Sequence, residues 1–543
     1  MKKFSAGFLL FCIVTFAFFI RIYRVSEIPP ALSWDEVSIG YNAYSILTTG
    51  RDEHGKFLPL DSFASYGDYK PPLAIYLTVP SVVIFGLNEF AVRFPSVLFG
   101  TLTVLITYFL IKELFSNSLF IIHYSLLTSF LLSISPWHIQ LSRAGFEANI
   151  ALFFVVSGVL LILRARYKSQ LLLFCWLPFV AAIYTFNSTR YFVPLFSIIL
   201  LIYYWKNFSK NKPLLLSGII IATVILLPIM PHIFSKEARL RFAEVNIFSD
   251  AGIVNQANAR MEVDNISWWS KIMHNRRVGF SQSYLTHVFD HFQPWFLFTR
   301  GDGNPKFSIQ DVGQMYLIEL PFFVLGLLWM FKKERRIASL AVLWIIASII
   351  PAATARETPH ALRIENSLPM WQLFVAFGIL TLSKKKLFVA VLIALLYFGN
   401  FSYFWHNYYN HYGKEYSGEW QYGYRESIQY AQSVKYQYES VVVDDIIGRP
   451  YMYALFYDRF DPRKFQDNPD RSVDGAGFFH VKAFDQYRFT DRPPQHFNKK
   501  TLYILRPTFV PKHANVQETI ELLNGDPILV IFDIVSDPPK ASL

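Results

Sequence analysis

Long apolar runs, separated by short polar connections, fill most of the chain up to residue 405. A helix that crosses the hydrocarbon core of a bilayer needs roughly 20 predominantly apolar residues, and about eleven runs come near that length. This pattern predicts a multi-pass α-helical membrane protein with about 11 to 13 transmembrane helices. The runs are Phe4–Tyr23, Phe94–Ile111, Leu119–Ile134, Ile150–Leu163, Leu171–Tyr184, Phe192–Trp205, Leu214–Met230, Met315–Phe331, Ile337–Ile350, Leu368–Leu382 and Leu387–Phe404.

One further run, Pro72–Leu87, is apolar but is interrupted by prolines, and the basic connections decide its placement. Cytoplasmic connections of membrane proteins carry an excess of Lys and Arg. This excess falls on one side, together with the N-terminus, only if Pro72–Leu87 does not cross the membrane. We therefore expect an interfacial or re-entrant helix here and a cytoplasmic N-terminus. The basic connections are Lys112–Glu113, Arg164–Lys168, Lys206–Lys212, Lys332–Arg336 and Ser383–Lys386.

The same accounting assigns the other connections to the outer face of the membrane. Two of them are long, namely residues 24–93 and residues 231–313. The second is too long for a simple connector, and its Trp268 and Trp269 indicate amphipathic helices that lie over the bundle. The first is rich in acidic and aromatic residues, and we regard it as the stretch around which the chain is organised.

The pattern changes after residue 405, where hydrophobicity falls and short strand-like segments alternate with helical ones. We predict helices at Tyr424–Lys435 and Val516–Leu523, and strands at Ser440–Ile446, Thr501–Leu505 and Pro527–Val535. The predicted organisation is a transmembrane domain over residues 1–405, with outer loops 24–93 and 231–313. A small extracytoplasmic α/β domain follows over residues 406–543.

Composition supports a membrane class. Hydrophobic residues make up 53% of the chain and charged residues 17%, above and below the averages for soluble proteins. The net charge of +11 lies largely in the basic connections, so we read it as a signal of topology and predict no nucleic-acid partner. Cys12 and Cys175 both lie in apolar runs, which implies neither a disulfide nor a cysteine metal site.

Four residues of the first outer loop and its end are candidates for chemistry. Asp35 and Glu36 follow the first span, where a carboxylate can act as a general base at the membrane surface, with the second acid in support. An ordinary solvated loop is the alternative for this pair. Lys70 precedes two prolines that fix its backbone, so it suits a phosphate near the headgroup layer. Arg93 could grip a phosphate bidentately or extend along a helix end to the interface.

Other candidates lie further along the outer face. Arg143 and Glu147 are four residues apart and could form a helical ion pair or line a sugar or acceptor pocket. Arg363 adds positive potential before a span and could bind a phosphate, and His360 beside it could line the sugar or acceptor pocket. An interfacial anchor is the alternative for both. A divalent cation between Asp35 and Glu147 is an alternative that no histidine spacing supports, so no metal ligand is assigned.

These motifs resemble those of the C-type superfamily of integral-membrane glycosyltransferases, in the branch of the dolichyl-phosphate-mannose protein mannosyltransferases and the lipid A aminoarabinose transferases. The resemblance covers roughly Phe4 to Glu147. It implies transfer of a sugar from a polyprenyl-phosphate carrier to an acceptor, with inversion. The motifs are Asp35-Glu36, Lys70-Pro71-Pro72-Leu73, Arg93-Phe94-Pro95-Ser96 with Gly100, Ser135-Pro136, Ser142-Arg143 and Glu147.

By this resemblance Asp35 would deprotonate the acceptor hydroxyl, while Lys70 and Arg93 would bind the carrier phosphate. A phosphate leaves readily as an anion, so cations can replace the paired general acid of a glycoside hydrolase. The implied partners are the polyprenyl-phosphate-sugar donor, the bilayer, and a glycan, lipid or protein acceptor. No cofactor is implied beyond the divalent cation considered above.

Two other classes of function compete with a transferase. A transporter or flippase of a lipid-linked or anionic solute would carry charges at mid-membrane and broken helices in two related halves, and the predicted spans show few of the former and none of the latter. A membrane anchor for the outer domain would not need so many spans.

Overall fold

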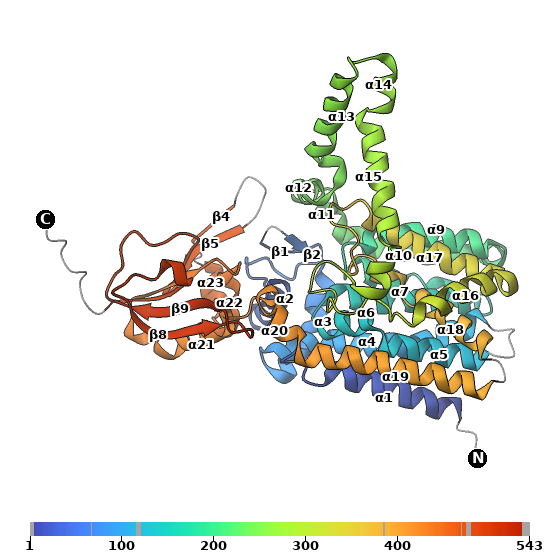
Figure 1. The fold of residues 1–543 in the computed structure, drawn as a ribbon, viewed down its shortest axis with the longest axis horizontal. Helices are drawn as coiled ribbons and strands as arrows, with labels where there is room; N and C mark the ends of the chain where they lie inside the picture. The colour runs from blue at the N-terminus through green and yellow to red at the C-terminus, as the bar shows by residue number, and fades with distance from the viewer. Residues whose placement is uncertain are drawn as a thin grey trace. The chain divides into compact units, whose positions relative to one another are not determined.

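The structure, a computed structural model, describes residues 5–66, 68–115, 121–383, 386–467, 470–473 and 479–534. Phe4, Leu119 and Val535, at which three predicted elements begin or end, lie outside the described residues, as do Gly67, Lys384 and Lys385. The chain forms two compact units (Figure 1). Unit 1 comprises residues 1–21, 96–142 and 147–405, and unit 2 comprises residues 22–95, 143–146 and 406–543. The first outer loop therefore belongs to the same unit as the C-terminal segment.

Unit 1 is helical. Five helices are long and apolar enough to cross a membrane, within the described residues: Glu89–Leu114, Glu147–Ala165, the continuous run Thr189–Ile233, Arg335–Ala352 and Leu387–Asn410. Shorter apolar helices accompany them, so the protein is a multi-pass helical one, and the exact number of spans stays a prediction. The helices are α1 (Ala6–Ile22), α4 (Glu89–Leu114), α5 (Ile121–Ile134), α6 (Pro136–Arg143), α7 (Glu147–Ala165), α8 (Leu177–Ile183), α9 (Thr189–Phe208), α10 (Lys212–Leu226), α11 (Met230–Ile233), α12 (Lys236–Val245), α13 (Ala251–Val263), α14 (Trp268–Met273), α15 (Arg276–Asp290), α16 (Glu319–Lys333), α17 (Arg335–Ala352), α18 (Met370–Leu382) and α19 (Leu387–Asn410).

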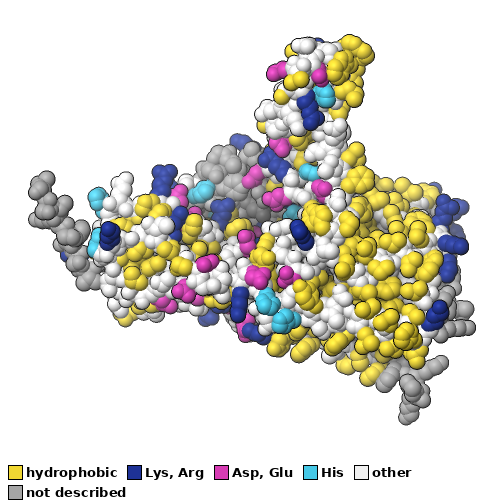
Figure 2. All heavy atoms as spheres, in the orientation of Figure 1, with side chains coloured by type: hydrophobic (Ala, Val, Ile, Leu, Met, Phe, Trp, Pro, Cys, Tyr) yellow, Lys and Arg dark blue, Asp and Glu magenta, His cyan; other side chains and the backbone are white. Residues whose placement is uncertain are grey.

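The basic connections of unit 1 meet at one end of its helices. Arg166 lies 3.4 Å from the carboxylate of Glu113, and its guanidinium packs over Tyr204. Arg336 donates to the carbonyl of Tyr203 at 3.0 Å. Figure 2 shows a broad apolar surface over these helices, bounded by Lys and Arg. This is the charge distribution expected of a bundle that spans a bilayer with one basic face.

The connections assigned to the outer face also gather together. Trp137 donates to the carbonyl of Ala361 at 3.2 Å, and Ser188 donates to the carbonyl of Arg363 at 3.2 Å. The segment 231–313 forms helices, as predicted, and four of them begin at a polar N-cap: Ser235, Asp250, Ser267 and Asn275. Helices α13 and α15 run side by side as an arm whose tip carries α14 (Figure 1).

Unit 2 combines helices with a mixed seven-stranded sheet in the order β4-β5-β6-β3-β7-β9-β8. The apolar run Val441–Val443 places β3 at the centre, where it pairs in parallel with β6 and β7. Its elements are α2 (Trp34–Thr49), β1 (Phe63–Ser65), β2 (Asp68–Lys70), α3 (Pro72–Phe85), α20 (Tyr412–Tyr416), α21 (Tyr424–Val434), β3 (Ser440–Asp444), α22 (Pro450–Tyr457), α23 (Pro462–Asp467), β4 (Asp470–Val473), β5 (Phe479–Phe484), β6 (Tyr487–Thr490), β7 (Thr501–Leu505), β8 (Asn515–Glu521) and β9 (Pro527–Asp533).

The predicted helix Val516–Leu523 is wrong, because these residues form the edge strand β8, which pairs antiparallel with β9. The turn between them contains Gly525 at φ +94°, in the left-handed region that suits an Asn-Gly hairpin. The other predicted elements of this segment are confirmed as α21, β3, β7 and β9. Helix α3 has 14 residues, or about 21 Å of helix, so it is shorter than the hydrocarbon core of about 30 Å. Its interfacial placement stays a prediction.

Candidate active site

The helix α2 fixes the acidic pair of the first outer loop. Ser33 caps its N-terminus, and the Glu36 carboxylate in turn accepts from the backbone N–H of Ser33 at 2.9 Å. This reciprocal arrangement is a capping box, encoded by the Ser-x-x-Glu spacing. Asp35 therefore stands in the first helical turn, where the helix dipole favours a carboxylate, and its side chain is 35% exposed.

The lysine reaches the same place from a separate element. Strands β1 and β2 form a hairpin in which Phe63 pairs with Lys70, and Pro71 and Pro72 then begin α3. The hairpin is tied to α2 because the hydroxyls of Ser38 and Ser65 lie 2.7 Å apart. Lys70 is consequently held at the end of a strand by the following prolines, as the sequence indicated.

Asp35 and Lys70 form an ion pair, with 2.8 Å between Oδ1 and Nζ. The lysine side chain is 5% exposed, and the aspartate is the partner that reaches solvent. Of the predicted site residues, these two are brought into direct contact, and the carboxylate of the pair is partly exposed. The pair places a carboxylate, which can accept a proton, beside a cation. Displacement of a phosphate by a hydroxyl uses both kinds of group.

Glu36 and Arg93 form a second pair, and both side chains are fully buried. Arg93 Nε donates to Glu36 at 2.8 Å, and its terminal nitrogens donate to the carbonyls of Val25, Pro29 and Ala31 at 2.6 to 2.8 Å. With the 3.4 Å contact from Nη2 to Glu36, every N–H of this guanidinium has a protein acceptor. This geometry fits a positioning role for Arg93 rather than the predicted phosphate contact.

Arg143 is likewise fully buried. It donates to the carbonyl of Ile28 at 2.9 Å and to the hydroxyl of Tyr408 at 3.2 Å, over whose ring it also packs. Arg143 ends α6 and Glu147 begins α7, so the two do not share a helix and the helical ion pair considered above is excluded. These contacts anchor the segment that precedes α2, and the lining of a sugar or acceptor pocket by Arg143 stays a prediction.

Residues after 405, which belong to the same unit, also hold the start of α2 and the residues just before it. Tyr453 of α22 donates to the carbonyl of Leu32 at 2.9 Å, and Gln421 accepts from the N–H of Trp34 at 3.3 Å. The guanidinium of Arg449 packs over the ring of Tyr66, whose hydroxyl donates to the carbonyl of Trp34. The candidate site is therefore built from both ends of the sequence.

His360 and Arg363, predicted as ligand contacts, lie in unit 1 beside a buried carboxylate, Asp302. The backbone N–H of Ala361 donates to Asp302 at 2.6 Å, and His360 Nδ1 lies 3.8 Å from the same oxygen. Burial raises the pKa of Asp302 to about 6 and lowers that of His360 well below its usual value. A hollow of about 410 Å³ adjoins this group, lined by Trp295, Arg300, Gly301, Asp302, Gly303 and Gln310.

Among the residues that the structure describes, there is no group of three or more His, Cys, Asp or Glu side chains that could hold a metal ion. Sequence reasoning alone did not identify several parts of the site. The Ser33-Trp34-Asp35-Glu36 spacing could have identified the start of α2 and the buried role of Glu36. Gly145, whose N–H donates to Glu36 at 2.8 Å, had no comparable signal.

Comparisons with known proteins relate the chain to a family model, a curated relative and solved structures. Residues 11–234 match the family model of dolichyl-phosphate-mannose-protein mannosyltransferase. A protein of Bacillus subtilis (strain 168) named "Putative mannosyltransferase YkcB" is 24% identical over 174 residues, which is 32% of this chain and 22% of that protein. The matched part is thus about a fifth of that relative.

Two solved structures share the fold. ArnT from Cupriavidus metallidurans, bound to undecaprenyl phosphate, aligns with a TM-score of 0.55 and 12% identity over 97% of this chain and 98% of its own. The oligosaccharyltransferase AglB from Archaeoglobus fulgidus, in complex with an inhibitory peptide and a dolichol-phosphate, aligns with a TM-score of 0.50 and 12% identity over 84% of this chain and 64% of its own. At these identities the likeness concerns the fold.

Proposed function

We propose that this chain is a C-type integral-membrane glycosyltransferase that moves a sugar from a polyprenyl-phosphate carrier to an acceptor at the outer face of the membrane, inverting the anomeric centre. The observation that carries the proposal is the 2.8 Å contact between Asp35 and Lys70 at the start of α2. The carrier phosphates named with ArnT and AglB support the choice of donor. No match described above is to a transporter.

The two residues divide the chemistry between them. The acceptor hydroxyl oxygen attacks the anomeric carbon while its proton passes to the carboxylate of Asp35. The bond between that carbon and the phosphate oxygen breaks, and its electron pair leaves with the carrier phosphate. Lys70 stabilises this departing anion. In the structure Lys70 is paired with Asp35, so an arriving phosphate competes for the lysine and frees the carboxylate for the acceptor.

The buried residues support this centre without touching the reactants. Arg93 and Gly145 hold Glu36, and Glu36 in turn fixes the first turn of α2, on which Asp35 stands. We keep Glu147, His360 and Arg363 as predicted contacts of the sugar, the acceptor or the phosphate. The proposed localisation is a cell-envelope membrane, with a cytoplasmic N-terminus and the sheet of unit 2 outside.

Several partners fit this proposal. The mannosyltransferase names of the family and of the Bacillus relative favour a hexose, whereas the likeness to ArnT admits a pentose. The acceptor is a glycan, a lipid or a protein. The chemistry assigned to Asp35 and Lys70 balances without a bound metal, and a divalent cation stays the alternative given above.

The experiment is sugar transfer by the purified protein in nanodiscs, with a radiolabelled polyprenyl-phosphate hexose and water or an added alcohol as acceptor. We expect parent protein to release or transfer the sugar. Lys70→Gln should raise the KM for the donor and lower kcat, whereas Lys56→Gln, which removes a lysine paired with Asp61 on the surface, should change neither. A parent protein inactive with every polyprenyl-phosphate sugar, or a Lys70 variant with parental kinetics, would refute the proposal.

A further inference from the structure

The arm of unit 1 ends in an apolar tip that the proposed reaction does not use. Among the exposed residues there, Trp268 has 77% of its surface accessible and Trp269 has 44%. Figure 2 shows apolar side chains gathered where α14 lies. Contiguous exposed apolar surface of this kind marks a contact with a membrane or a protein. The tip comprises Val263, Ile266, Trp268, Trp269, Ile272 and Met273.

The base of the arm sits where a predicted span ends. Helix α17, one of the helices long and apolar enough to cross a membrane, ends at Ala352. Residues around this end of α17 hold the arm. The N–H of Ile247 donates to the carbonyl of Thr354 at 2.9 Å, and the hydroxyl of Tyr284 donates to the carbonyl of Ile350 at 3.2 Å. The arm thus leaves the bundle at the level of the membrane boundary.

The direction of the arm keeps its tip at that level. Figure 1 shows α13 and α15 running across the direction of α16, α17 and α18 of the same unit. An arm that starts at the boundary and runs across the spans keeps its tip near the level of the bilayer surface. Tryptophan is enriched at this depth because its ring is apolar and its N–H is polar.

The residues near the tip carry a net positive charge, which favours bilayers that contain anionic lipid. Residues 260–277 contain four cations, Arg260, Lys271, Arg276 and Arg277, against the two acids Glu262 and Asp264. Arginine and lysine beside apolar residues on an interfacial helix are typical of binding to anionic lipid.

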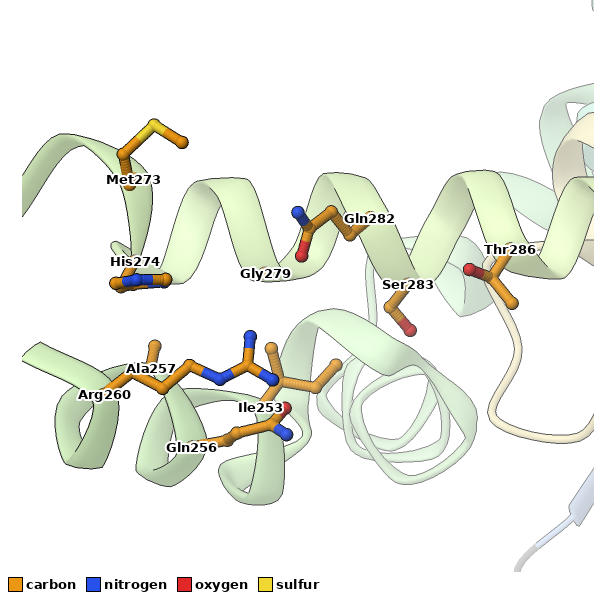
Figure 3. Close-up of a pocket in the computed structure, with 10 residues that line it drawn as sticks. All are labelled: Ile253, Gln256, Ala257, Arg260, Met273, His274, Gly279, Gln282, Ser283 and Thr286. Atoms are coloured by element: carbon orange, nitrogen blue, oxygen red, sulfur yellow. The ribbon is translucent and has the colours of Figure 1, made fainter. Parts of the chain in front are cut away.

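A cavity beside the tip offers a place for the anionic headgroup. It lies between α13 and α15 and has a volume of about 250 Å³. Figure 3 shows Arg260 extending along it, with His274 at the end nearest α14 and Ser283 on the facing helix. Among the described residues Arg260 has no carboxylate within 4.0 Å, whereas His274 lies 3.4 Å from Asp264. Of the two basic residues that line the cavity, the arginine is therefore the one available to a phosphate.

From these observations we propose that the arm binds the outer leaflet of the bilayer that the protein spans. The apolar tip enters the interface, and Arg260 pairs with the phosphate of an anionic phospholipid held in the cavity. The binding is non-covalent and does not depend on the transferase activity proposed above.

The experiment places a fluorescent label at the tip of the full-length protein in nanodiscs. Ile272→Cys is labelled in a background in which Cys12 and Cys175 are replaced by alanine, and Asn255→Cys, exposed on α13 opposite the cavity, is the matched control. We expect nitroxide-labelled phosphatidylcholine to quench the label at 272 several-fold more than the label at 255. Equal quenching at the two positions, or a label at 272 shielded from both lipid and aqueous quenchers by a protein, would overturn the proposal.

A second comparison tests the headgroup. Replacing part of the phosphatidylcholine by phosphatidylglycerol should increase quenching at 272, and Arg260→Gln should weaken this preference about fivefold, since one basic residue contributes about 1 kcal/mol of binding near an anionic surface. Arg239→Gln, a substitution outside the arm, should leave the preference unchanged. Millimolar inorganic phosphate that alters the signal in lipid-free detergent as strongly as phosphatidylglycerol does in nanodiscs would show a free-phosphate site and overturn the headgroup assignment.

Discussion

The buried pair of Glu36 and Arg93 provides the sharpest test of how the candidate site is built. Arg93→Met removes a cation whose N–H groups all have acceptors, and it leaves a fully buried carboxylate with only its neutral donors. If Arg93 positions the loop, this change should mainly unfold unit 2. If Arg93 instead binds the carrier phosphate, the fold should survive and donor binding should weaken.

The structure gives a magnitude for the first outcome. Removing one partner of a buried ion pair costs about 3 to 5 kcal/mol, because the remaining charge is uncompensated. The same substitution at Arg24 provides a matched control, since its 2.6 Å pair with Glu27 is 45% and 59% exposed and an exposed pair contributes about 0 to 1 kcal/mol. The double variant Glu36→Gln/Arg93→Met should recover about 1 to 3 kcal/mol relative to the sum of the single changes.

The assay is denaturant unfolding in detergent, followed by near-ultraviolet circular dichroism, together with the KM for the donor. We expect Arg93→Met to unfold at a much lower denaturant concentration than Arg24→Met. The double variant Glu36→Gln/Arg93→Met should lose less stability than the sum of its two single changes. An Arg93→Met protein as stable as the Arg24 control, with a raised donor KM and unchanged kcat, would refute the positioning role. It would restore the phosphate contact predicted from the sequence.

Two further predictions concern stability. Burial raises the pKa of Asp302 to about 6, so the neutral carboxyl stabilises the folded protein at low pH and this stabilisation is lost as pH rises from about 4 to 6. The loss amounts to up to about 3 kcal/mol of unfolding free energy. In thermal unfolding at different pH values, Asp302→Asn should not show this pH-dependent loss. Gly40→Ala places a Cβ 2.6 Å from the ring of Phe456 and should destabilise by about 1 to 3 kcal/mol, whereas Gly399→Ala, in open space on α19, should not; equal melting temperatures would contradict this.

Much of the fold could be predicted from the sequence because its signals are local. Apolar runs identified the helices of unit 1, and the run Val441–Val443 identified the central strand. The helix predicted for Val516–Leu523 failed because its partner strand β9 supplies the hydrogen bonds, and the nearest local signal was the Asn524-Gly525 turn. Strand pairing overrode a weak helical pattern.

The site could be predicted where a residue with suitable chemistry also stands beside a local signal in the sequence that fixes its position. Asp35 and Lys70 were chosen as an acid beside a span and a lysine before two prolines, and the structure brings them together. Arg93 and Arg143 were both candidate ligand contacts, but both are fully buried. Their N–H groups donate to carbonyls of residues 25–31 and, for Arg143, to the hydroxyl of Tyr408. No spacing in the sequence reports such contacts.

The central claim is that the carboxylate of Asp35 takes the acceptor proton. The most direct measurement is single-turnover transfer by Asp35→Asn, compared with Asp61→Asn, which alters an aspartate of the same unit that pairs with Lys56. We predict that the Asp35 variant still binds the donor but transfers its sugar about 10² to 10⁴ times more slowly, the contribution of a general base. Transfer at the parental rate by a folded Asp35→Asn protein would contradict the account.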